Sequence, residues 1–600
     1  MFVTFSGVHG DVSKLSSVRT QGWQALWHGF VYLEGTPAGT QSVLKFLREG
    51  AHNLITTSEQ LKGIYFISLL DRQSGTRHAF IDPNGLYHAF CSRSRVGTSF
   101  LELAAAERLG SKDIQPESLV EFFHYGNLSF GTTFFSEIRR LNPEHIFRIS
   151  VDRKTELVPR KLRDLSVPPA HNFEQCLAGF AGSVADEKLS LDLTGGIDSR
   201  LLAVTLQHLG LPFELALSGI EGNTDILIAQ QVAESLGREL HVTYHNVENL
   251  GASLPGLFAA CDGLFDVVRA HRPFQLHTHR RDRGVSLSLS AAGGELFKDF
   301  WWLQDFPWYA RKVPNIERLY ATRIVPVEPP HWYLTKDYRK LSEQYRGRFC
   351  DRLSKYAVRG NTQTYDRIYY ELKMRDYAGR FLTNHMGLVH CYAPYLDREV
   401  AAIGYNLPRH IRAFNIFHRQ TTTLYNPAAA IIRTTEGEMS VSSSWIRIMA
   451  DTPKYVHDKL SRLTRKLQQR LLKTGGTQES PNNPELWAQA RALVHSRSAL
   501  ERLKDHGLIS GALQLKDLTF EHVGNILSLD LLFEHLAAAP QAQVTDIDTR
   551  KLQCHIQNQM DEDYHQGQWK VQGRYSQHQW RGFLVASKSL CPKKHREDLR

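Results

Sequence analysis

The segment LSLDLTGGIDSRLLAV, residues 189–204, constrains the fold of this chain more than any other stretch. Leu189, Leu191 and Leu193 alternate with polar residues, a pattern typical of a half-buried or buried strand. TGGIDS follows at residues 194–199, and an apolar helical pattern begins at its end. The segment therefore predicts a buried strand, a tight glycine turn and a helix in series.

Strands and helices alternate from about residue 185 to residue 290. Strand-like runs occur as KLSLDL, FELALSG (213–219), ELHVTYH (239–245) and VSLSLS (285–290), and the helical patterns SRLLAVTLQHLG and TDILIAQQVAESLG follow the first two. This alternation predicts βαβ units and a parallel sheet, whose ligands bind at the carboxyl ends of the strands. The glycine turn, residues 194–199, lies at such an end.

The flanking regions have different patterns. Residues 1–165 contain short apolar and aromatic runs broken by turns such as RQSG and DPNG, which predicts antiparallel hairpins. SVPPA (166–170) is interpreted as a linker. Residues 300–540 have mostly helical patterns, and the last 60 residues are polar, so we expect weak order there.

The composition favours a soluble globular protein, with 42% hydrophobic and 22% charged residues. A net charge of +10 over 600 residues is mild and does not by itself favour a nucleic-acid partner. No apolar run has the length of a membrane span, and the N-terminus lacks the pattern of a secretory signal. Seven scattered cysteines without a C-x-x-C pair argue against a disulfide framework or a zinc site. We therefore expect a cytoplasmic protein without a membrane partner.

The residue types of the glycine turn suit an anion with several oxygens. Gly195 and Gly196 allow backbone N–H groups to converge, Thr194 and Ser199 add hydroxyls, and the following helix begins at the same place. Asp198 is an acid inside this anion site, which is unfavourable unless a cation lies between. Mg²⁺ that bridges Asp198 to phosphate oxygens resolves the conflict.

Three further segments narrow the class of protein. The turn lacks the G-x-x-x-x-G-K-[ST] spacing and resembles instead the S-G-G-x-D-S loop of enzymes that cleave ATP between the α and β phosphates. SLSAAGGELFKDFW (288–301) resembles the S-G-x-G-x-D-E-L-F segment of the asparagine synthetase family, and HCYAPYLD (390–397) resembles its E-x-R-x-P-F-L-D segment. The runs before residue 91 resemble its glutaminase-like domain. The resemblance covers about residues 1–435.

The resemblance implies a fold and a domain order. It implies an N-terminal αββα glutaminase-like sandwich and a C-terminal parallel-sheet ATP-pyrophosphatase domain with a helical extension. The expected boundaries are 1–165 for the first domain, 170–435 for the second, 436–540 for the extension and 541–600 for a polar tail. The implied activity is ATP-dependent activation of a carboxylate as an acyl-adenylate, with release of pyrophosphate, and attack by ammonia or an amine.

The resemblance also assigns residues to ATP and Mg²⁺. The residues that it assigns to phosphate binding are those of the turn and one later serine: Thr194, Gly195, Gly196, Asp198, Ser199 and Ser290. Glu295 falls where the family has its second metal-binding aspartate, so Asp198 and Glu295 would hold Mg²⁺ together.

Two departures concern the glutaminase half. The working glutaminase domains of the family carry a nucleophilic cysteine at residue 2, where this chain has Phe2, and Phe cannot attack an amide. The N-G-E that helps to hold glutamine is also missing around Leu33, Glu34 and Gly35. Cys91 is not placed to substitute. We therefore expect no glutaminase activity from this domain.

Three more departures concern the second half of the reaction. Ala292 stands where the family has glutamate or tyrosine, and His390 aligns with the glutamate of E-x-R-x-P-F-L-D. His390 is either a catalytic base or a structural histidine beside Pro394. The family's lysine should fall within residues 415–427, which contain Arg419 but no lysine. Arg419 supplies charge with a different geometry.

The leading functional hypothesis is an ATP-dependent amide-forming ligase of the asparagine synthase type. Its default substrate is aspartate, and its nitrogen donor is free ammonia or an amine of the substrate. A peptide or β-lactam-type cyclase and an enzyme that amidates a carboxyl sugar are alternatives within this class. An RNA-modifying ATP pyrophosphatase is a second class, and a nucleotide-binding scaffold without turnover is a third, which Ala292 and His390 motivate.

The segment 454–473 motivates the RNA alternative. Leu460, Leu463, Leu467 and Leu471 are spaced 3, 4 and 4 residues apart, and seven lysines and arginines surround them. The spacing predicts an amphipathic helix. Its basic face is either simply solvated or a contact for an anionic partner.

Overall fold

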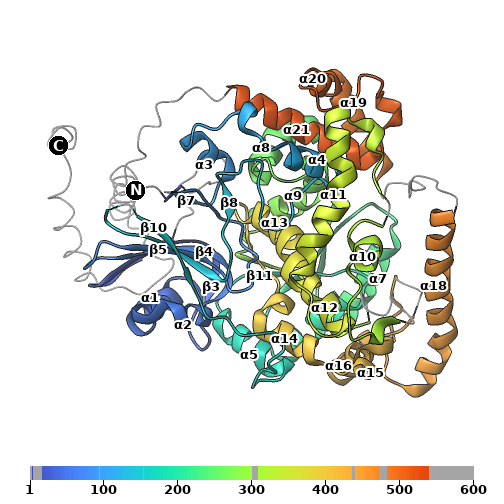
Figure 1. Cartoon of the computed structure of the whole chain (residues 1–600). Coiled ribbons are helices and arrows are strands. Elements are labelled where there is room, and N and C mark those ends of the chain that lie inside the picture. Colours follow the sequence, from blue (N-terminus) through green and yellow to red (C-terminus); the bar gives the residue numbers. More distant parts are fainter. Residues whose placement is uncertain are drawn as a thin grey trace. The chain divides into compact units, whose positions relative to one another are not determined.

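Two sheets form the N-terminal part of the chain in this computed structural model, which describes residues 3–4, 16–93, 95–152, 154–299, 308–326, 328–435, 439–471 and 483–538. The larger sheet is antiparallel throughout, in the order β10-β9-β5-β4-β3-β2 (Figure 1). Its strands are β2 (Ser16–Arg19), β3 (Trp23–Tyr32), β4 (Lys62–Asp71), β5 (Arg77–Ile81), β9 (His145–Ile149) and β10 (Thr155–Pro159). The smaller sheet, in the order β1-β7-β6-β8, contains β1 (Val3–Thr4), β6 (Phe90–Cys91), β7 (Val96–Gly97) and β8 (Arg139–Arg140). The prediction of antiparallel hairpins in the N-terminal region is confirmed.

A five-stranded sheet, parallel throughout, follows in the chain. Its order is β13-β12-β11-β14-β15. The strands are β11 (Leu189–Asp192), β12 (Glu214–Gly219), β13 (Leu240–Tyr244), β14 (Leu287–Leu289) and β15 (His390–Tyr392). The first four are the strands that the sequence predicts. The fifth comes from a three-residue run after a long helical region, too short to have a pattern of its own.

The strand order reverses beside β11. The chain proceeds outward from β11 to β12 and β13, and then returns to place β14 and β15 on the other side of β11. Connections that leave in opposite directions open a crevice at the carboxyl ends of the two central strands. The glycine turn follows β11 and Ser290 follows β14, so both begin at this crevice.

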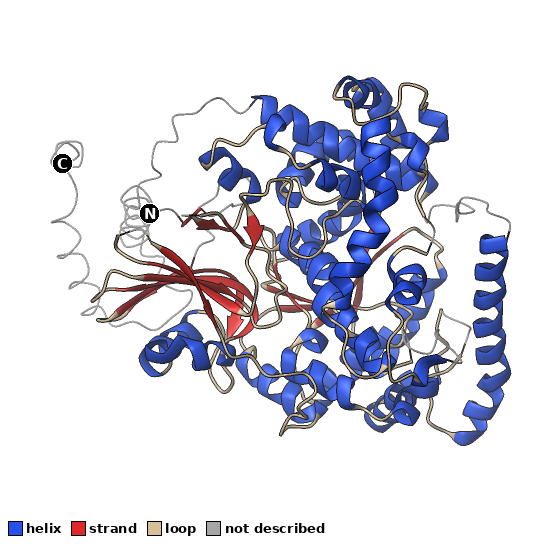
Figure 2. Ribbon diagram, viewed as in Figure 1, coloured by secondary structure: helices blue, strands red, loops and turns tan. Residues whose placement is uncertain are grey.

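Helices make up most of the remaining chain (Figure 2). Those of the first half are α1 (Thr40–Glu49), α2 (Leu54–Thr57), α3 (Phe100–Ala106), α4 (Pro116–Tyr125), α5 (Phe173–Ser183), α6 (Asp198–His208), α7 (Thr224–Ser235), α8 (Leu250–Cys261) and α9 (Val267–Asp282). Those of the second half are α10 (Ile316–Leu319), α11 (Lys336–Ser354), α12 (Asn361–Ile368), α13 (Gly379–His385), α14 (Arg398–Asn406), α15 (Arg409–Arg412), α16 (Ile416–Tyr425), α17 (Pro427–Ile431), α18 (Trp445–Leu471), α19 (Pro484–Ser496), α20 (Ala499–Asp505) and α21 (Phe520–Ala538). No helix in the described ranges combines the length and the apolar character that a membrane crossing requires.

The C-terminal helices pack into the rest of the chain. α21 packs against α4, α9, α19 and α20. Leu527 of α21, Phe122 of α4 and Leu257 of α8 are fully buried in one apolar cluster. The helical extension is therefore not a separate layer, although the domain boundaries remain predictions. The polar tail, residues 541–600, lies outside the described residues.

The parallel sheet meets the larger N-terminal sheet at strand β15. The hydroxyls of Tyr32 on β3 and Tyr392 on β15 lie 3.1 Å apart, and the ring centroids of Phe30 and Tyr392 lie 5.3 Å apart. These rings belong to one continuous buried cluster that also contains Leu191 of β11. The parallel sheet thus rests with its β15 edge on the N-terminal sheet, and burial of this apolar surface stabilises the junction.

Candidate functional site

Two hydroxyls close the glycine turn. The backbone N–H of Thr194 donates to Ser199 Oγ at 3.0 Å, and the two side-chain oxygens also lie 3.0 Å apart. The N–H of Gly196 donates to Thr194 Oγ1 at 3.3 Å. Thr194 and Ser199, both predicted to bind phosphate, therefore shape the turn as well. Asp198, which lies within the turn, is also the first residue of α6, as the sequence predicts.

The N–H of Gly195 already holds an anionic oxygen. It donates to Asp225 Oδ1 at 2.8 Å, and Asp225 lies in the first turn of α7. A β-carbon at residue 195 would lie 2.7 Å from Thr435 Cγ2 and 2.9 Å from Asp225 Oδ1, so a larger residue would force one of these side chains to shift. The N–H of Gly195 thus points toward a carboxylate oxygen, and the binding of phosphate by this turn stays a prediction. The sequence analysis did not identify Asp225.

The Asp198 carboxylate lies between two basic side chains. Lys298 Nζ lies 2.5 Å from Oδ2, and His418 Nε2 lies 2.8 Å from Oδ1. Burial acts to raise the pKa of Asp198, but the Lys298 ammonium and the His418 ring hold it well below its usual value. Asp198 is therefore ionised and already has a cation beside it. Lys298 lies in the predicted 288–301 segment, and His418 lies within the 415–427 window, but neither was identified from the sequence.

His418 is held in one orientation by its surroundings. Its side chain is fully buried, and Nδ1 has no hydrogen-bond partner among the residues that the structure describes. The bond from Nε2 to Asp198 is the hydrogen bond that holds the ring among the described residues.

Gly294, the residue before Glu295, lies close against Asp198. Gly294 begins the 3₁₀ turn η6 (Gly294–Phe297), and a β-carbon there would lie 2.7 Å from Asp198 Cβ. Glu295 Oε2 accepts a hydrogen bond from Tyr369. Burial, and then Glu295, raise the pKa of Tyr369 well above its usual value, so this phenol stays protonated. The structure thus places the chain neighbour of Glu295 against Asp198, and the metal-binding role of the two acids stays a prediction.

The side chains present at this site include the kind of ligand that Mg²⁺ binds, with one condition. Carboxylate oxygens such as those of Asp198 and Glu295 are the ligands that Mg²⁺ prefers. Both oxygens of Asp198 are, however, engaged by Lys298 and His418. A metal ion at Asp198 would therefore have to share this carboxylate with Lys298 and His418.

Ser290 reaches the same edge of the sheet. Its N–H donates to the Tyr392 carbonyl at 2.9 Å, and its Oγ accepts from the N–H of Ala292 at 3.3 Å. It directly follows Leu289, which is in register with Leu191 of β11. The carboxyl ends of β11 and β14 therefore bring the turn, Ser290 and Glu295 together.

His390 occupies the other end of its strand. It is the first residue of β15 and is in register with Leu287, the first residue of β14. Tyr392, at the carboxyl end of β15, lies two residues further, or about 7 Å along the strand. The backbone of His390 is thus set back from the carboxyl edge, and its role as a base remains a prediction.

Arg419 is buried and bonds away from the turn. Its guanidinium donates to the carbonyls of Phe414 at 3.0 Å and Ser442 at 2.9 Å, and lies 3.3 Å from Asp451 Oδ2. These contacts connect α16 to the segment that leads into α18 and to α18 itself. The catalytic role predicted for Arg419 remains a prediction, whereas its neighbour His418 is the residue that contacts Asp198.

The N-terminal domain offers a poor nucleophile at Cys91. Burial raises the pKa of the Cys91 thiol to about 11, so the thiol is protonated at neutral pH. Glu34, where the family's glutamine-binding motif was sought, forms an ion pair with Lys62 at 2.5 Å. Phe2 lies outside the described residues.

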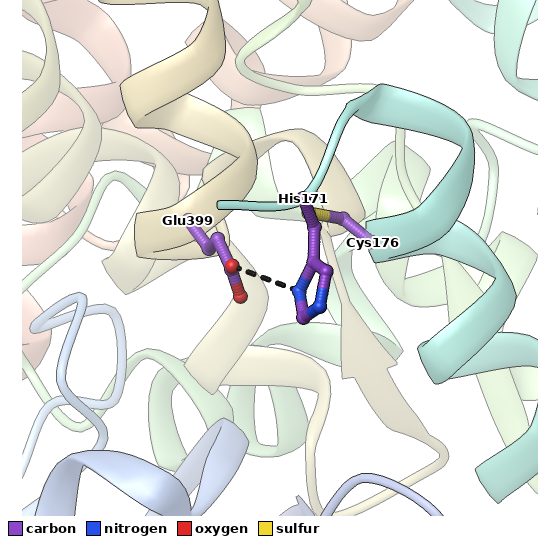
Figure 3. A group of neighbouring side chains, drawn as sticks. All are labelled: His171, Cys176 and Glu399. Carbon is purple, nitrogen blue, oxygen red and sulfur yellow. Dashed lines mark hydrogen bonds and ion pairs between the residues drawn. The ribbon is translucent and has the colours of Figure 1, made fainter. Parts of the chain in front are cut away.

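A second group of polar side chains lies at the junction of the two sheets. His171, Cys176 and Glu399 each place one ligand-type atom within 4.8 Å of the others, and Figure 3 shows the His171 ring directed toward Glu399. His171 Nδ1 lies 3.2 Å from Glu399 Oε1, and Lys62 Nζ lies 2.9 Å from Glu399 Oε2. Because Lys62 pairs with Glu399 as well as with Glu34, the group is explained as part of an ion-pair network.

One comparison with known proteins gives a match. The sequence profile described as asparagine synthase matches residues 181–495, slightly more than half of the chain. The matched range contains the glycine turn, Glu295 and both basic partners of Asp198. No protein of curated function matches the chain.

Proposed function

Because the chain belongs to the asparagine synthase family, we propose that it is an ATP-dependent amide-forming ligase that cleaves ATP to AMP and pyrophosphate. The observation that carries the proposal is the Gly195 N–H, which binds a carboxylate oxygen at the point where the strand order reverses. A backbone N–H group that binds a carboxylate oxygen at this position can also bind a phosphate oxygen. The pyrophosphate portion of ATP supplies such oxygens.

The residues of the turn have distinct tasks in this proposal. The N–H groups of Gly195 and Gly196 and the beginning of α6 hold the phosphates, while Thr194 and Ser199 keep the turn closed. Asp198 and Glu295 would hold Mg²⁺, which supplies positive charge to the phosphates when it is bound. The carboxylate substrate then becomes an acyl-adenylate, and a nitrogen nucleophile forms the amide.

Two residues of the N-terminal region bear on the nitrogen donor of the proposed reaction. Residue 2 is Phe2, and the Cys91 thiol has a pKa of about 11, so neither residue supplies a thiolate for glutamine hydrolysis. The proposed donor is therefore free ammonia or an amine of the substrate itself. Aspartate is the default carboxylate for the first case, and an intramolecular cyclisation of a peptide or β-lactam precursor corresponds to the second.

The test is product analysis with a matched control. The protein is incubated with ATP, Mg²⁺, ammonium and a panel of carboxylic acids, and AMP and pyrophosphate are quantified. Asp198→Ala should abolish pyrophosphate release, whereas Asp186→Ala, which changes an exposed aspartate before β11, should not. If ADP and phosphate are the products, cleavage between the α and β phosphates is wrong and the proposal fails.

A further inference from the structure

Helix α18 exposes a continuous apolar face. Five of its large apolar side chains are exposed, with exposed fractions of 73% for Trp445, 63% for Ile446, 65% for Met449, 45% for Val456 and 54% for Leu460. At about 100° per residue, these five positions fall within one arc of about 100° around the helix. Soluble proteins seldom expose such a contiguous apolar stripe unless a partner covers it.

The opposite face attaches the helix to the rest of the chain. Tyr455 stacks on Phe414 with ring centroids 4.3 Å apart, and its hydroxyl bonds to Asp299. Asp451 accepts hydrogen bonds from Arg419 at 3.3 Å and from Ser440 at 2.9 Å. Because these contacts hold one face inward, the apolar stripe faces outward. Figure 1 shows α18, in orange, beside α15 and α16 at the border of the described chain.

The same helix concentrates positive charge. Residues 445–471 contain seven lysines and arginines but only two aspartates, a net charge of +5, which is half of the +10 of the whole chain. One of the two aspartates, Asp451, is already paired with Arg419. In the sequence, the spacing of the stripe continues from Leu460 through Leu463, Leu467 and Leu471. An apolar stripe with a strongly basic remainder is typical of helices that lie in the interface of a bilayer.

We propose that α18 binds the surface of an anionic phospholipid bilayer, with its exposed apolar stripe among the acyl chains and with the net positive charge of the segment attracted to the anionic headgroups. A second copy of the chain is disfavoured as the occupant, because two helices of charge +5 repel each other. A merely solvated basic face does not account for exposed Trp445, Met449 and Leu460 on one side. The proposal replaces the expectation of no membrane partner with peripheral binding, which needs no spanning segment.

The test is flotation of the full-length protein with lipid vesicles. Wild-type protein should float with phosphatidylcholine–phosphatidylglycerol vesicles, remain unbound with pure phosphatidylcholine, and lose binding as salt is added. Met449→Glu and Val456→Glu should each weaken binding at least about tenfold, and Lys454→Glu about fivefold or more. Leu424→Glu, at a side chain of α16 that is 74% exposed, is the matched control and should bind as the wild type does.

Three outcomes would overturn the proposal. The first is the absence of flotation with anionic vesicles while circular dichroism shows a folded protein. The second is equal loss of binding in Leu424→Glu and Met449→Glu, which would make binding nonspecific. The third is a wild-type dimer in light scattering that Met449→Glu converts to a monomer, because a second copy would then cover the stripe.

Discussion

The Lys298 ammonium lies 2.5 Å from the carboxylate of Asp198, the acid that belongs to the glycine turn. The sequence alone predicts that this acid needs a cation. The structure supplies one from the chain itself, with His418 on the other oxygen at 2.8 Å. An ammonium that partners the acid before substrate arrives lowers the electrostatic cost of an ionised group in this position.

Replacing Lys298 should change the response to Mg²⁺. Lys298→Met removes the ammonium that competes with a metal ion for Asp198, so the half-saturating Mg²⁺ concentration for pyrophosphate release should fall about fivefold. Mg²⁺-induced stabilisation in thermal unfolding provides a second readout that does not depend on turnover. Lys355→Met, at an exposed lysine after α11, serves as the control. An unchanged Mg²⁺ dependence in Lys298→Met would show that the two cations do not compete.

Neutralising Asp225 should strengthen nucleotide binding. Asp225→Asn keeps an oxygen acceptor for the Gly195 N–H but removes a negative charge from the phosphate site. We expect the Kd for ATP, measured by calorimetry, to decrease about threefold to tenfold. Glu221→Gln alters an exposed acid in the loop that precedes α7 and should leave Kd unchanged. Weaker binding in Asp225→Asn would instead assign Asp225 a supporting part in nucleotide binding.

A methyl group at residue 294 should separate the two carboxylates. In Gly294→Ala the new β-carbon would lie 2.7 Å from Asp198 Cβ and Cγ, so η6 must move away from α6. Pyrophosphate release should fall at least about tenfold, because positions of groups at an active site tolerate little displacement. Gly347→Ala on α11, where a β-carbon meets nothing within 4 Å, is the control. Full activity of Gly294→Ala would contradict the proposed pairing of Asp198 with Glu295.

The free energy of unfolding should depend on pH through Glu121. Burial raises its pKa to about 7, and Ser129 and Tyr345 donate hydrogen bonds to its carboxyl group. A pKa raised by folding means that the folded state binds the proton more tightly, so stability is greatest below the unfolded value of about 4.3 and declines as pH rises toward 7.

Glu121→Gln should flatten this decline, by about 3 kcal/mol at most between pH 4.5 and pH 8, as measured by denaturant unfolding. Glu117→Gln changes an exposed acid on the same helix, α4, and should follow the wild-type profile. A steep decline that persists in Glu121→Gln would place the pH dependence in another group.

Glutamine should not replace ammonium as the nitrogen source. Amide formation is measured with either donor at equal concentration, and we expect product with ammonium or with a substrate amine only. Cys91→Ser should leave that rate within about twofold of the wild type, since a thiol with a pKa of about 11 is not ionised at neutral pH. Glutamate release from glutamine that disappears in Cys91→Ser would show that Cys91 is a nucleophile after all.

Local patterns determined much of the fold. The alternation of Leu189 and Leu191, two adjacent glycines and a helical pattern from Asp198 are properties of short segments, and they predict the strand, the turn and the helix correctly. The same holds for four of the five parallel strands. β15 was not predicted, because three residues cannot show a period and its pairing with β14 depends on about a hundred intervening residues.

The partners of the turn were decided only by tertiary structure. Lys298 is 100 residues from Asp198 in the chain, and His418 is 220 residues away. Sequence spacing carries no information on whether such side chains meet, because their directions depend on how η6 and α16 pack against α6. The sequence by itself determined that residues 194–199 form a glycine turn with an acid in it, between a strand and a helix. Packing alone decided that the cation beside that acid is Lys298 and that Arg419 bonds toward α18, because both outcomes depend on contacts between elements distant in the chain.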